Sequence, residues 1–232
     1  LSRNPRSINL RFILPLAMLY ITIYLAADSV AYKMVTFGVI LEPGPPFIFP
    51  LSYVIGNIIA EVYGYSLAKK IILYTLFFQF LYAFLVTLVI KLPHPDFWNM
   101  QDSYNQVFGN IIRFVSAGCI SIVSSHFVNI YIFTKWKILL NGKHFLLRSI
   151  GASSIGGFVL VTMIMIFGYS GTIDFHSSII MFFSIYALEL FYAFIAAWPA
   201  WIISKLLKNK EQLDVYDINT NFNPFKFTEE KN

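Results

Sequence analysis

Carboxylate and amide side chains recur at helical spacing inside an apolar stretch near the start of the chain. In residues 47–66, Tyr53, Asn57 and Glu61 follow one another at intervals of four residues. This spacing places the three side chains on one face of an α-helix. Carboxylate and amide groups are costly in an apolar environment unless they have a partner. The pattern therefore indicates a polar, aromatic face that is turned away from lipid.

Polar groups also mark three other apolar stretches. A charged side chain at mid-bilayer costs about 2.5–3.5 kcal/mol, so such groups face a bundle interior, a partner or water. We expect the four polar stripes to converge on a central cavity. Its candidate substrate-binding residues are Tyr53, Asn57, Glu61, His126, Asn129 and Glu189; the supporting stripe residues are Tyr20, Tyr24, Ser121, Ser125, Tyr186 and Tyr192.

Asp28 and Arg113 fall at similar depth in the outer half of two stretches, so we expect them to form an ion pair. That pair could be an extracellular gate or a structural bridge. Pairing of Glu61 with Lys69 or Lys70 is the alternative to substrate contact. His126 and Asn129 could instead serve as interhelical hydrogen bonders.

The stretches that carry these residues are long enough to cross a membrane. Hydrophobic residues make up 57% of the 232 residues and charged residues 12%, against about 45–50% and 25% in soluble domains. A bilayer core of about 30 Å needs roughly 20 helical residues. We therefore expect an all-α, six-transmembrane-helix bundle in residues 1–210 and a polar cytoplasmic tail in residues 211–232. The six spans are 12–33, 47–66, 68–90, 108–134, 149–169 and 178–207.

The basic residues orient the expected bundle. With six spans, one side of the membrane receives nearly all lysines and arginines, which predicts that this side and both termini are cytoplasmic. That side holds Arg3, Arg6, Arg11, Lys69, Lys70, Lys135, Lys137, Lys143, Arg148, Lys205, Lys208 and Lys210; the other holds Lys33, Lys91, Glu42, Asp96, Asp102 and Asp174.

Several other protein classes fit the sequence poorly. The net charge of +5 sits at the ends of apolar runs, so nucleic-acid binding is not indicated. The single cysteine, Cys119, permits no disulfide within the chain and no zinc cluster. No His-Glu-x-x-His or Gly-x-Ser-x-Gly motif occurs, so an enzyme is not expected. A signal peptide is the alternative for residues 12–35, but that run exceeds the usual 7–15 residues of its apolar core.

The sequence resembles the vitamin uptake transporter family, also called queuosine-precursor transporters. The resemblance rests on an aromatic-proline pair followed by "EVYGYSLAKKII", on Arg113 followed by "SSHFVNIYIF", on "LLRSIGASSIGG" and on Pro199, in that order over residues 47–205. The chain departs from the family where members carry acids, at Asn57, Asn129 and Val161, and at Glu189, where a basic residue is common.

The resemblance implies a multi-pass protein of the bacterial inner membrane that imports 7-deazapurine precursors of queuosine. The polar and aromatic residues fit such a planar heterocycle, because carboxylates and amides can hydrogen-bond the edges of a base and aromatic rings stack on its plane. The resemblance also implies six helices like those of the substrate-binding subunits of energy-coupling-factor transporters. We expect ion-coupled or facilitated secondary transport, with protons as a candidate ion and without a cofactor. The alternative is a substrate-binding subunit that needs energising partners; a homo-oligomer is also open.

Overall fold

The computed structural model describes residues 11–37, 40–168, 174–218 and 220–223. Apart from one antiparallel hairpin, in which Met34 pairs with Pro43 and Phe37 with Ile40, all regular elements of the described chain are helices. The elements are α1 (Ile13–Ser29), β1 (Met34–Phe37), β2 (Ile40–Pro43), the 3₁₀ helix η1 (Pro45–Phe47), α2 (Pro50–Tyr63), α3 (Tyr65–Ile90), α4 (Gln101–Phe108), α5 (Ile111–Leu139), α6 (Phe145–Gly168) and α7 (Phe175–Glu211).

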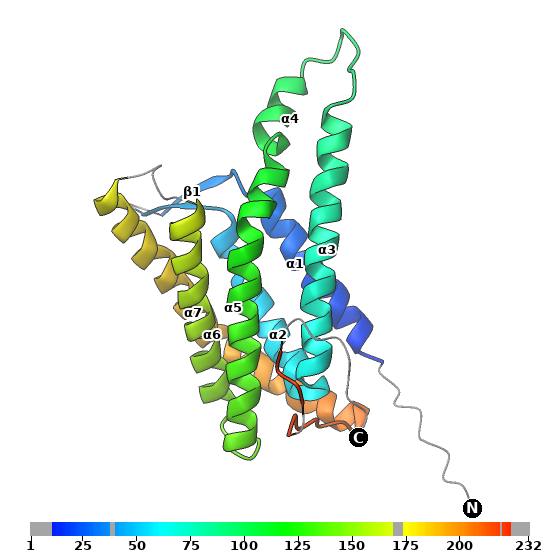
Figure 1. Cartoon of the computed structure of the whole chain (residues 1–232), viewed down its shortest axis with the longest axis vertical. Coiled ribbons are helices and arrows are strands. Elements are labelled where there is room, and N and C mark those ends of the chain that lie inside the picture. Colours follow the sequence, from blue (N-terminus) through cyan, green and yellow to red (C-terminus); the bar gives the residue numbers. More distant parts are fainter. Residues whose placement is uncertain (1–10, 38–39, 169–173, 219, 224–232) are drawn as a thin grey trace, which may run out of the picture.

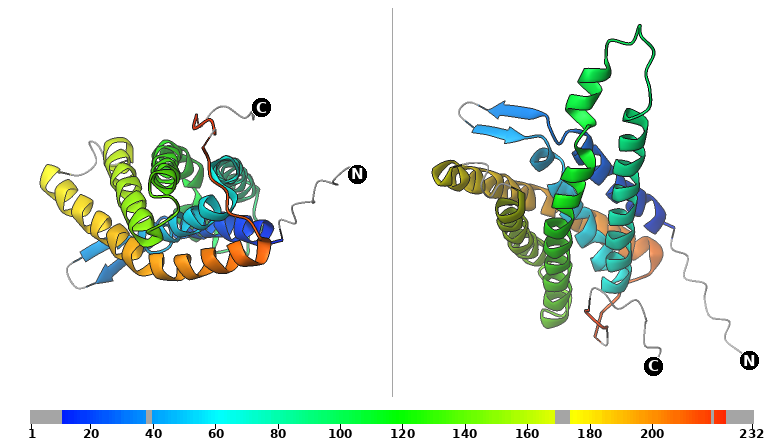
Figure 2. Two further views of the ribbon diagram at one scale, coloured as in Figure 1. Left: turned by 90° about the horizontal axis from the view of Figure 1, so that it is seen from below. Right: turned by 45° about the horizontal axis from the view of Figure 1, so that its top comes forward.

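The helices α1, α2, α3, α5, α6 and α7 alternate in direction, so their connections gather at two ends of one bundle (Figure 1). We call one end the hairpin end, because it carries β1 and β2, and the other the tail end, because residues 212–218 and 220–223 lie there. Both α1 and α7 reach the tail end, where the Phe12 amide donates to Glu211 Oε1 at 2.7 Å. Figure 2 shows that α7 crosses the bundle obliquely from one end to the other.

Length and composition identify this as a membrane protein. Among the described residues, α3, α6 and α7 are long and apolar enough to cross a bilayer. A fourth span results if the helical segments Gln101–Ser116 and Gly118–Leu139, which meet at an angle of 51° within α5, count as one. α1 has 17 residues and α2 only 14, and 14 residues rise about 21 Å. The expected all-α membrane fold is confirmed, whereas six spans and cytoplasmic termini remain predictions.

α2 is the central helix of the bundle. Every residue from 56 to 65 is buried, whereas α3 and α7 expose large apolar side chains such as Phe77, Phe84, Phe194 and Trp198 on their outer faces. Apolar groups outside and polar groups inside suit a helix bundle surrounded by lipid. The polar face of α2 is therefore packed against the other helices.

A single residue joins α2 to α3. Gly64 has φ of +87°, a conformation that glycine adopts without the Cβ clash of other residues. A Cβ at Gly64 would lie 2.7 Å from Val215 Cγ1, so a side chain there would also collide with the chain after α7. The two helices consequently form a tight antiparallel pair whose turn contacts the tail.

The hairpin and α4 are elements that we did not predict from the sequence. The proline- and glycine-rich sequence of residues 42–46 is typical of a stiff, turn-rich linker, whereas in the structure these residues form the end of β2 and the start of η1. The β-branched residues Val35, Thr36 and Ile40 on both sides of Gly38 are a signal that could have identified the hairpin.

Candidate functional site

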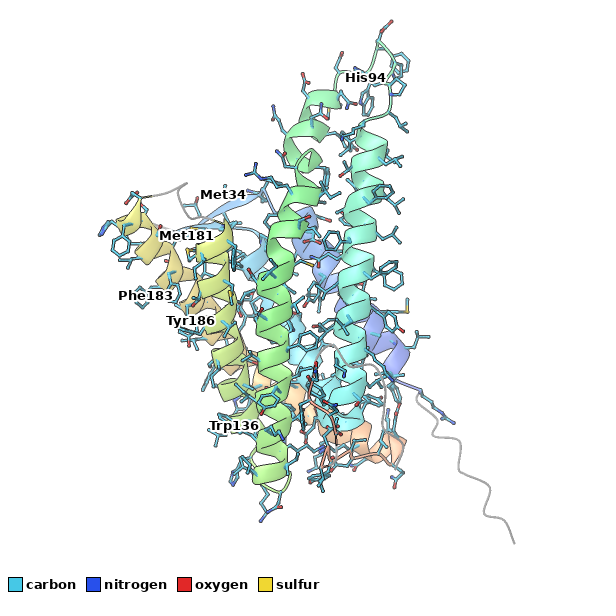
Figure 3. The ribbon with its side chains drawn as sticks, in the orientation of Figure 1. Met34, His94, Trp136, Met181, Phe183 and Tyr186 are labelled. Atoms are coloured by element: carbon cyan, nitrogen blue, oxygen red, sulfur yellow. The ribbon has the colours of Figure 1, made fainter. Side chains whose placement is uncertain are left out.

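A cavity of about 670 Å³ lies in the hairpin-end half of the bundle, between α1, α3, α5, α6, α7 and the hairpin. This volume is within the range of about 300–1,000 Å³ that small-molecule sites occupy. Figure 3 labels Met34 of the hairpin, which lines the cavity, and Trp136, which marks the opposite end of α5. The polar lining residues are Asp28, Gln79, Asn110, Arg113 and Glu189, and the aromatic ones are Tyr24, Tyr32, Phe49 and Phe114.

Glu189 projects from α7 into the wall of this cavity. Its side chain is only 4% exposed, and within the described part of the chain its carboxylate makes neither a hydrogen bond nor an ion pair. Gly157 of α6 faces it: a Cβ there would lie 3.4 Å from Glu189 Cβ. A buried carboxylate without a partner is costly, so this one is suited to bind a donor group from a ligand.

Asp28 also lines the cavity, but its partner is not the one that we expected. Gln79 Nε2 of α3 donates to Asp28 Oδ1 at 3.0 Å. Arg113 lines the same cavity and is exposed, and no ion pair between Asp28 and Arg113 occurs among the described residues. The expected ion pair is thus replaced by a carboxylate–amide contact between α1 and α3.

A layer of aromatic rings and one histidine closes the cavity on its inner side. His126 Nδ1 lies 2.9 Å from the Tyr20 hydroxyl and Nε2 lies 3.2 Å from Ser52 Oγ. The His126 ring stacks on Tyr53 with centroids 4.3 Å apart and planes 5° apart. Tyr24, which lines the cavity, lies 3.2 Å from Tyr20 between their hydroxyl oxygens. His126 and Tyr53 therefore belong to the floor below the cavity.

Asn57 and Asn129 form the next layer toward the tail end. Asn129 Nδ2 donates to Asn57 Oδ1 at 2.9 Å, and Asn57 Nδ2 donates to the hydroxyls of Ser149 and Ser153 at 3.2 and 3.1 Å. Gly156 permits this approach of α5 and α6, because a Cβ there would lie 2.9 Å from Asn129 Cβ. The two asparagines predicted as site residues do meet, in a closed layer that joins α2, α5 and α6.

Glu61 lies below the asparagines in an ion cluster. Arg148 donates from both terminal nitrogens to the two carboxylate oxygens at 2.8 and 3.1 Å, and Lys208 Nζ lies 2.6 Å from Oε1. Bidentate guanidinium–carboxylate contacts are among the strongest charge-assisted hydrogen bonds. The cluster joins α2, α6 and α7, and the anticipated partners Lys69 and Lys70 are replaced by cations from distant parts of the sequence.

The tail continues this ion cluster. Lys137 Nζ donates to the Glu61 carbonyl, to Asp214 Oδ1 and to the Val215 carbonyl at 2.6, 2.6 and 2.7 Å. Burial raises the pKa of Asp214, but the hydrogen bonds from Lys137 and Lys208 outweigh it and hold that pKa below its ordinary value. Asp217 Oδ2 accepts from the Tyr65 amide at 2.9 Å. The tail thus caps α2, α3 and α5 at one end of the bundle.

The structure therefore separates the residues that sequence reasoning grouped together. Three of them line the cavity, namely Asp28, Arg113 and Glu189; the others form closed layers between the cavity and the tail end, namely Tyr53, Asn57, Glu61, His126 and Asn129. Gln79, Lys137, Arg148, Lys208 and Asp214 were missed as site residues. Lys137, Arg148 and Lys208 had served only to orient the chain, and their position at helix ends was the available signal.

A helical membrane protein with a ligand-sized cavity at one end and closed polar layers at the other has the architecture of a small-molecule transporter. Among the described residues no group of three or more His, Cys, Asp and Glu side chains could hold a metal ion.

The family comparison specifies this class further. The chain belongs to the putative vitamin uptake transporter family, whose model matches residues 43–203. No curated protein and no solved structure matches the chain. The matched region agrees with the stretch on which the sequence resemblance rests, and it contains the cavity residue Glu189.

Proposed function

We propose that this protein imports a small planar heterocycle, a 7-deazapurine precursor of queuosine, across the bacterial inner membrane by secondary transport. The observation that carries the proposal is Glu189, a buried carboxylate without a protein partner among the described residues, in a cavity of about 670 Å³. A cavity of this size accommodates a bicyclic base with ring substituents. The match to a vitamin uptake family supports transport, and the substrate is our inference.

The cavity offers the contacts that such a base requires. Glu189 accepts hydrogen bonds from a ring N–H and an exocyclic amino group, as carboxylates do on nucleobase edges. Tyr24 and Phe49, whose ring centroids lie 5.2 Å apart, provide aromatic faces beside it. The side-chain amide of Asn110 can both donate and accept, which suits a lactam edge.

The distribution of charge supports an orientation in which the tail end is cytoplasmic. Basic side chains concentrate there, as expected for cytoplasmic loops. The cavity would then face outward, and the described conformation would be outward-facing. The tail-end cations are Lys69, Lys70, Lys137, Lys143, Arg148, Lys205, Lys208 and Lys210.

The closed layers act as the inner barrier in this proposal. Substrate passes from Glu189 inward only after the stacked pair Tyr53–His126 and the pair Asn57–Asn129 separate. Both pairs can then contact the substrate in transit. Glu61 is the innermost gate residue, because its salt bridges join α2 to α6 and α7.

A binding experiment tests the role of Glu189. Thermal shifts of the purified protein are measured against 7-deazaguanine, guanine and a panel of vitamins. Loss of one charge-assisted hydrogen bond costs about 1.5–3 kcal/mol, so Glu189→Gln should weaken 7-deazaguanine binding by roughly 10- to 150-fold. Asp102→Asn, which removes an exposed carboxylate from α4, is the matched control. Equal affinity of Glu189→Gln and the unaltered protein would remove Glu189 from the site.

A substrate-binding subunit of a multi-subunit uptake system is the alternative function. Ala27 and Ala31 are small residues four apart in the sequence, and such a pair can provide a docking face for a partner helix. Both line the cavity in this structure, so that face is not available for docking. Uptake of 7-deazaguanine in a host without energising subunits distinguishes the two: persistence favours the solitary transporter, and loss favours the subunit.

A further inference from the structure

The contact between Asp28 and Gln79 leaves two buried oxygen atoms unpaired. Asp28 is 5% exposed and Gln79 is 1% exposed, and one hydrogen bond, from Nε2 to Oδ1, joins them at 3.0 Å. Over the described residues, Asp28 Oδ2 and Gln79 Oε1 have no hydrogen-bond partner. Buried polar atoms almost always have a hydrogen-bond partner, so two unpaired oxygens in one contact require an explanation.

The two unpaired oxygens belong to the two planar groups, one carboxyl and one amide, that already share a hydrogen bond. An ionised carboxylate only accepts, whereas a protonated one gains an O–H donor. The existing bond holds the amide nitrogen of Gln79 against one oxygen of the Asp28 carboxyl group. A proton on Oδ2 would supply the donor that Gln79 Oε1 lacks. A carboxylic acid and a primary amide joined in this way form a cyclic pair with two hydrogen bonds. Rotating the amide by half a turn would not remove the need for this proton, because a carboxylate that only accepts would still face one amide oxygen.

We propose that Asp28 is the proton-binding site that couples transport to a proton gradient, and that Gln79 is the residue that positions it. One proton satisfies both unpaired oxygens, and the site lies on the wall of the cavity, so water reaches it through that cavity. This inference rests on the proposed transport function, because coupling has meaning only if the protein moves a substrate.

The groups around Asp28 are compatible with reversible protonation. Arg113 of α5 and Glu189 of α7 line the same cavity and act in opposite senses, the first favouring the carboxylate and the second disfavouring it. The other titratable side chains nearby are Tyr24 and Tyr32, which line the cavity, Cys119 of α5, which interacts electrostatically with Asp28, and Tyr82 of α3, which bonds Ser29. Among the described residues none of these forms a salt bridge that would fix the carboxylate in its charged form.

Protonation also changes the free-energy cost of moving Asp28 with its helix. A charged carboxylate at the α1–α3 interface resists transfer into an apolar environment, whereas the neutral acid–amide pair does not carry that penalty. Proton uptake from the cavity would thus permit α1 and α3 to change position, and proton release on the other side would restore the charge.

A test without substrate measures the proton directly. Infrared difference spectra of the purified protein, recorded between acidic and alkaline buffers, should contain the carboxyl C=O band of protonated Asp28. This band should be absent in Asp28→Asn and present in Glu189→Gln. Asn at this position reproduces the neutral acid, since its amide can donate to Gln79 Oε1, so the variant should fold. Gln79→Leu should retain the band with an altered pH midpoint. A titrating band that is identical in Asp28→Asn would overturn the assignment.

A transport assay tests whether the proton gradient drives accumulation of the substrate. In proteoliposomes clamped at zero membrane potential, a gradient of one pH unit should drive about tenfold accumulation of 7-deazaguanine with one proton. In Asp28→Asn the ratio between uptake with and without the gradient should fall to one. A gradient response that survives in Asp28→Asn, or accumulation driven by sodium and lost in that variant, would overturn the proton assignment. Failure of the unaltered protein to take up 7-deazaguanine would refute the proposed function instead, and the infrared band would still decide the role of Asp28.

Discussion

The ion cluster at the tail end predicts that Arg148 is a principal determinant of stability. Its side chain is fully buried and donates to both oxygens of Glu61 and to the carbonyls of Lys143 and Gly142, at 3.0 and 3.2 Å for the latter two. Removing one partner of a buried ion pair costs about 3–5 kcal/mol, because the remaining charge is unpaired. Lys208 still binds Glu61 at 2.6 Å and offsets part of the loss. We therefore expect Arg148→Met to lower the free energy of unfolding by about 3 kcal/mol.

Equilibrium unfolding in mixed micelles measures this change. Lys205→Met is the matched control, because Lys205 is exposed and its described contact is with the Trp201 ring, 5.7 Å from the centroid; its effect should stay within about 0.5–1 kcal/mol.

A double-mutant cycle separates the pairing from lost packing. In a Glu61→Gln background no unpaired carboxylate remains, so Arg148→Met should cost less there, with a coupling energy of at least about 1 kcal/mol. The reasoning fails if Arg148→Met costs no more than Lys205→Met, or if the effects of Glu61→Gln and Arg148→Met simply add.

Three further predictions concern other parts of the fold. Gly64→Ala should destabilise the protein by about 1–3 kcal/mol, because of its positive φ and the collision with Val215, and should expose residues 212–223 to protease. Burial raises the pKa of Glu42, in β2, to about 7, so the hairpin should dock more firmly at pH 5 than at pH 8, as measured by amide exchange of residues 34–43. Asn57→Ala should leave the Asn129 amide without an acceptor, cost about 1–3 kcal/mol and strongly reduce uptake.

Each of these predictions has a control and a contrary outcome. Gly56→Ala introduces only an ordinary contact, 3.7 Å from the Tyr20 ring, so equal effects of the two glycine variants would contradict the argument from Gly64. Glu42→Gln should abolish the pH dependence of exchange, and Asp102→Asn should not; a dependence that persists in Glu42→Gln must have another source. Normal uptake by Asn57→Ala would exclude the asparagine layer from the transport path. The control for this variant is Asn209→Ala, because Asn209 is exposed.

The sign of the Glu42 effect follows from its pKa in the two states. The ordinary value is 4.5 and the folded value is about 7, so the folded hairpin retains a proton that the released hairpin loses. Its contribution is complete below about pH 4.5 and disappears as the pH rises through about 7. The hydrogen bond from Ser184 opposes this shift and limits it.

The sequence predicted the membrane fold and the family because these depend on local composition and on short motifs. Apolar runs of about 20 residues and the segment around Glu61 and Gly64 were sufficient. The stripes of Tyr53, Asn57 and Asn129 also face the bundle interior, since four-residue spacing fixes a helical face regardless of what packs against it.

The partners of the charged residues could not be obtained in this way. Glu61 pairs with Arg148 and Lys208, which lie 87 and 147 residues away in the sequence. The nearest lysines along the chain were the only candidates that helical spacing could rank. Asp28 presented the same problem, because depth alone suggested Arg113, whereas the packing of α1 on α3 brings Gln79 to it.

The single-residue connection at Gly64 has a mechanical consequence. Because only one residue separates α2 from α3, the end of α2 cannot move without moving the start of α3. This residue also packs directly against Val215. A shift of the innermost helix must therefore displace the chain that follows α7, so the interior of the bundle is linked to a surface segment. A fluorophore attached near Asn223 would report each such shift remotely, without any label near the substrate.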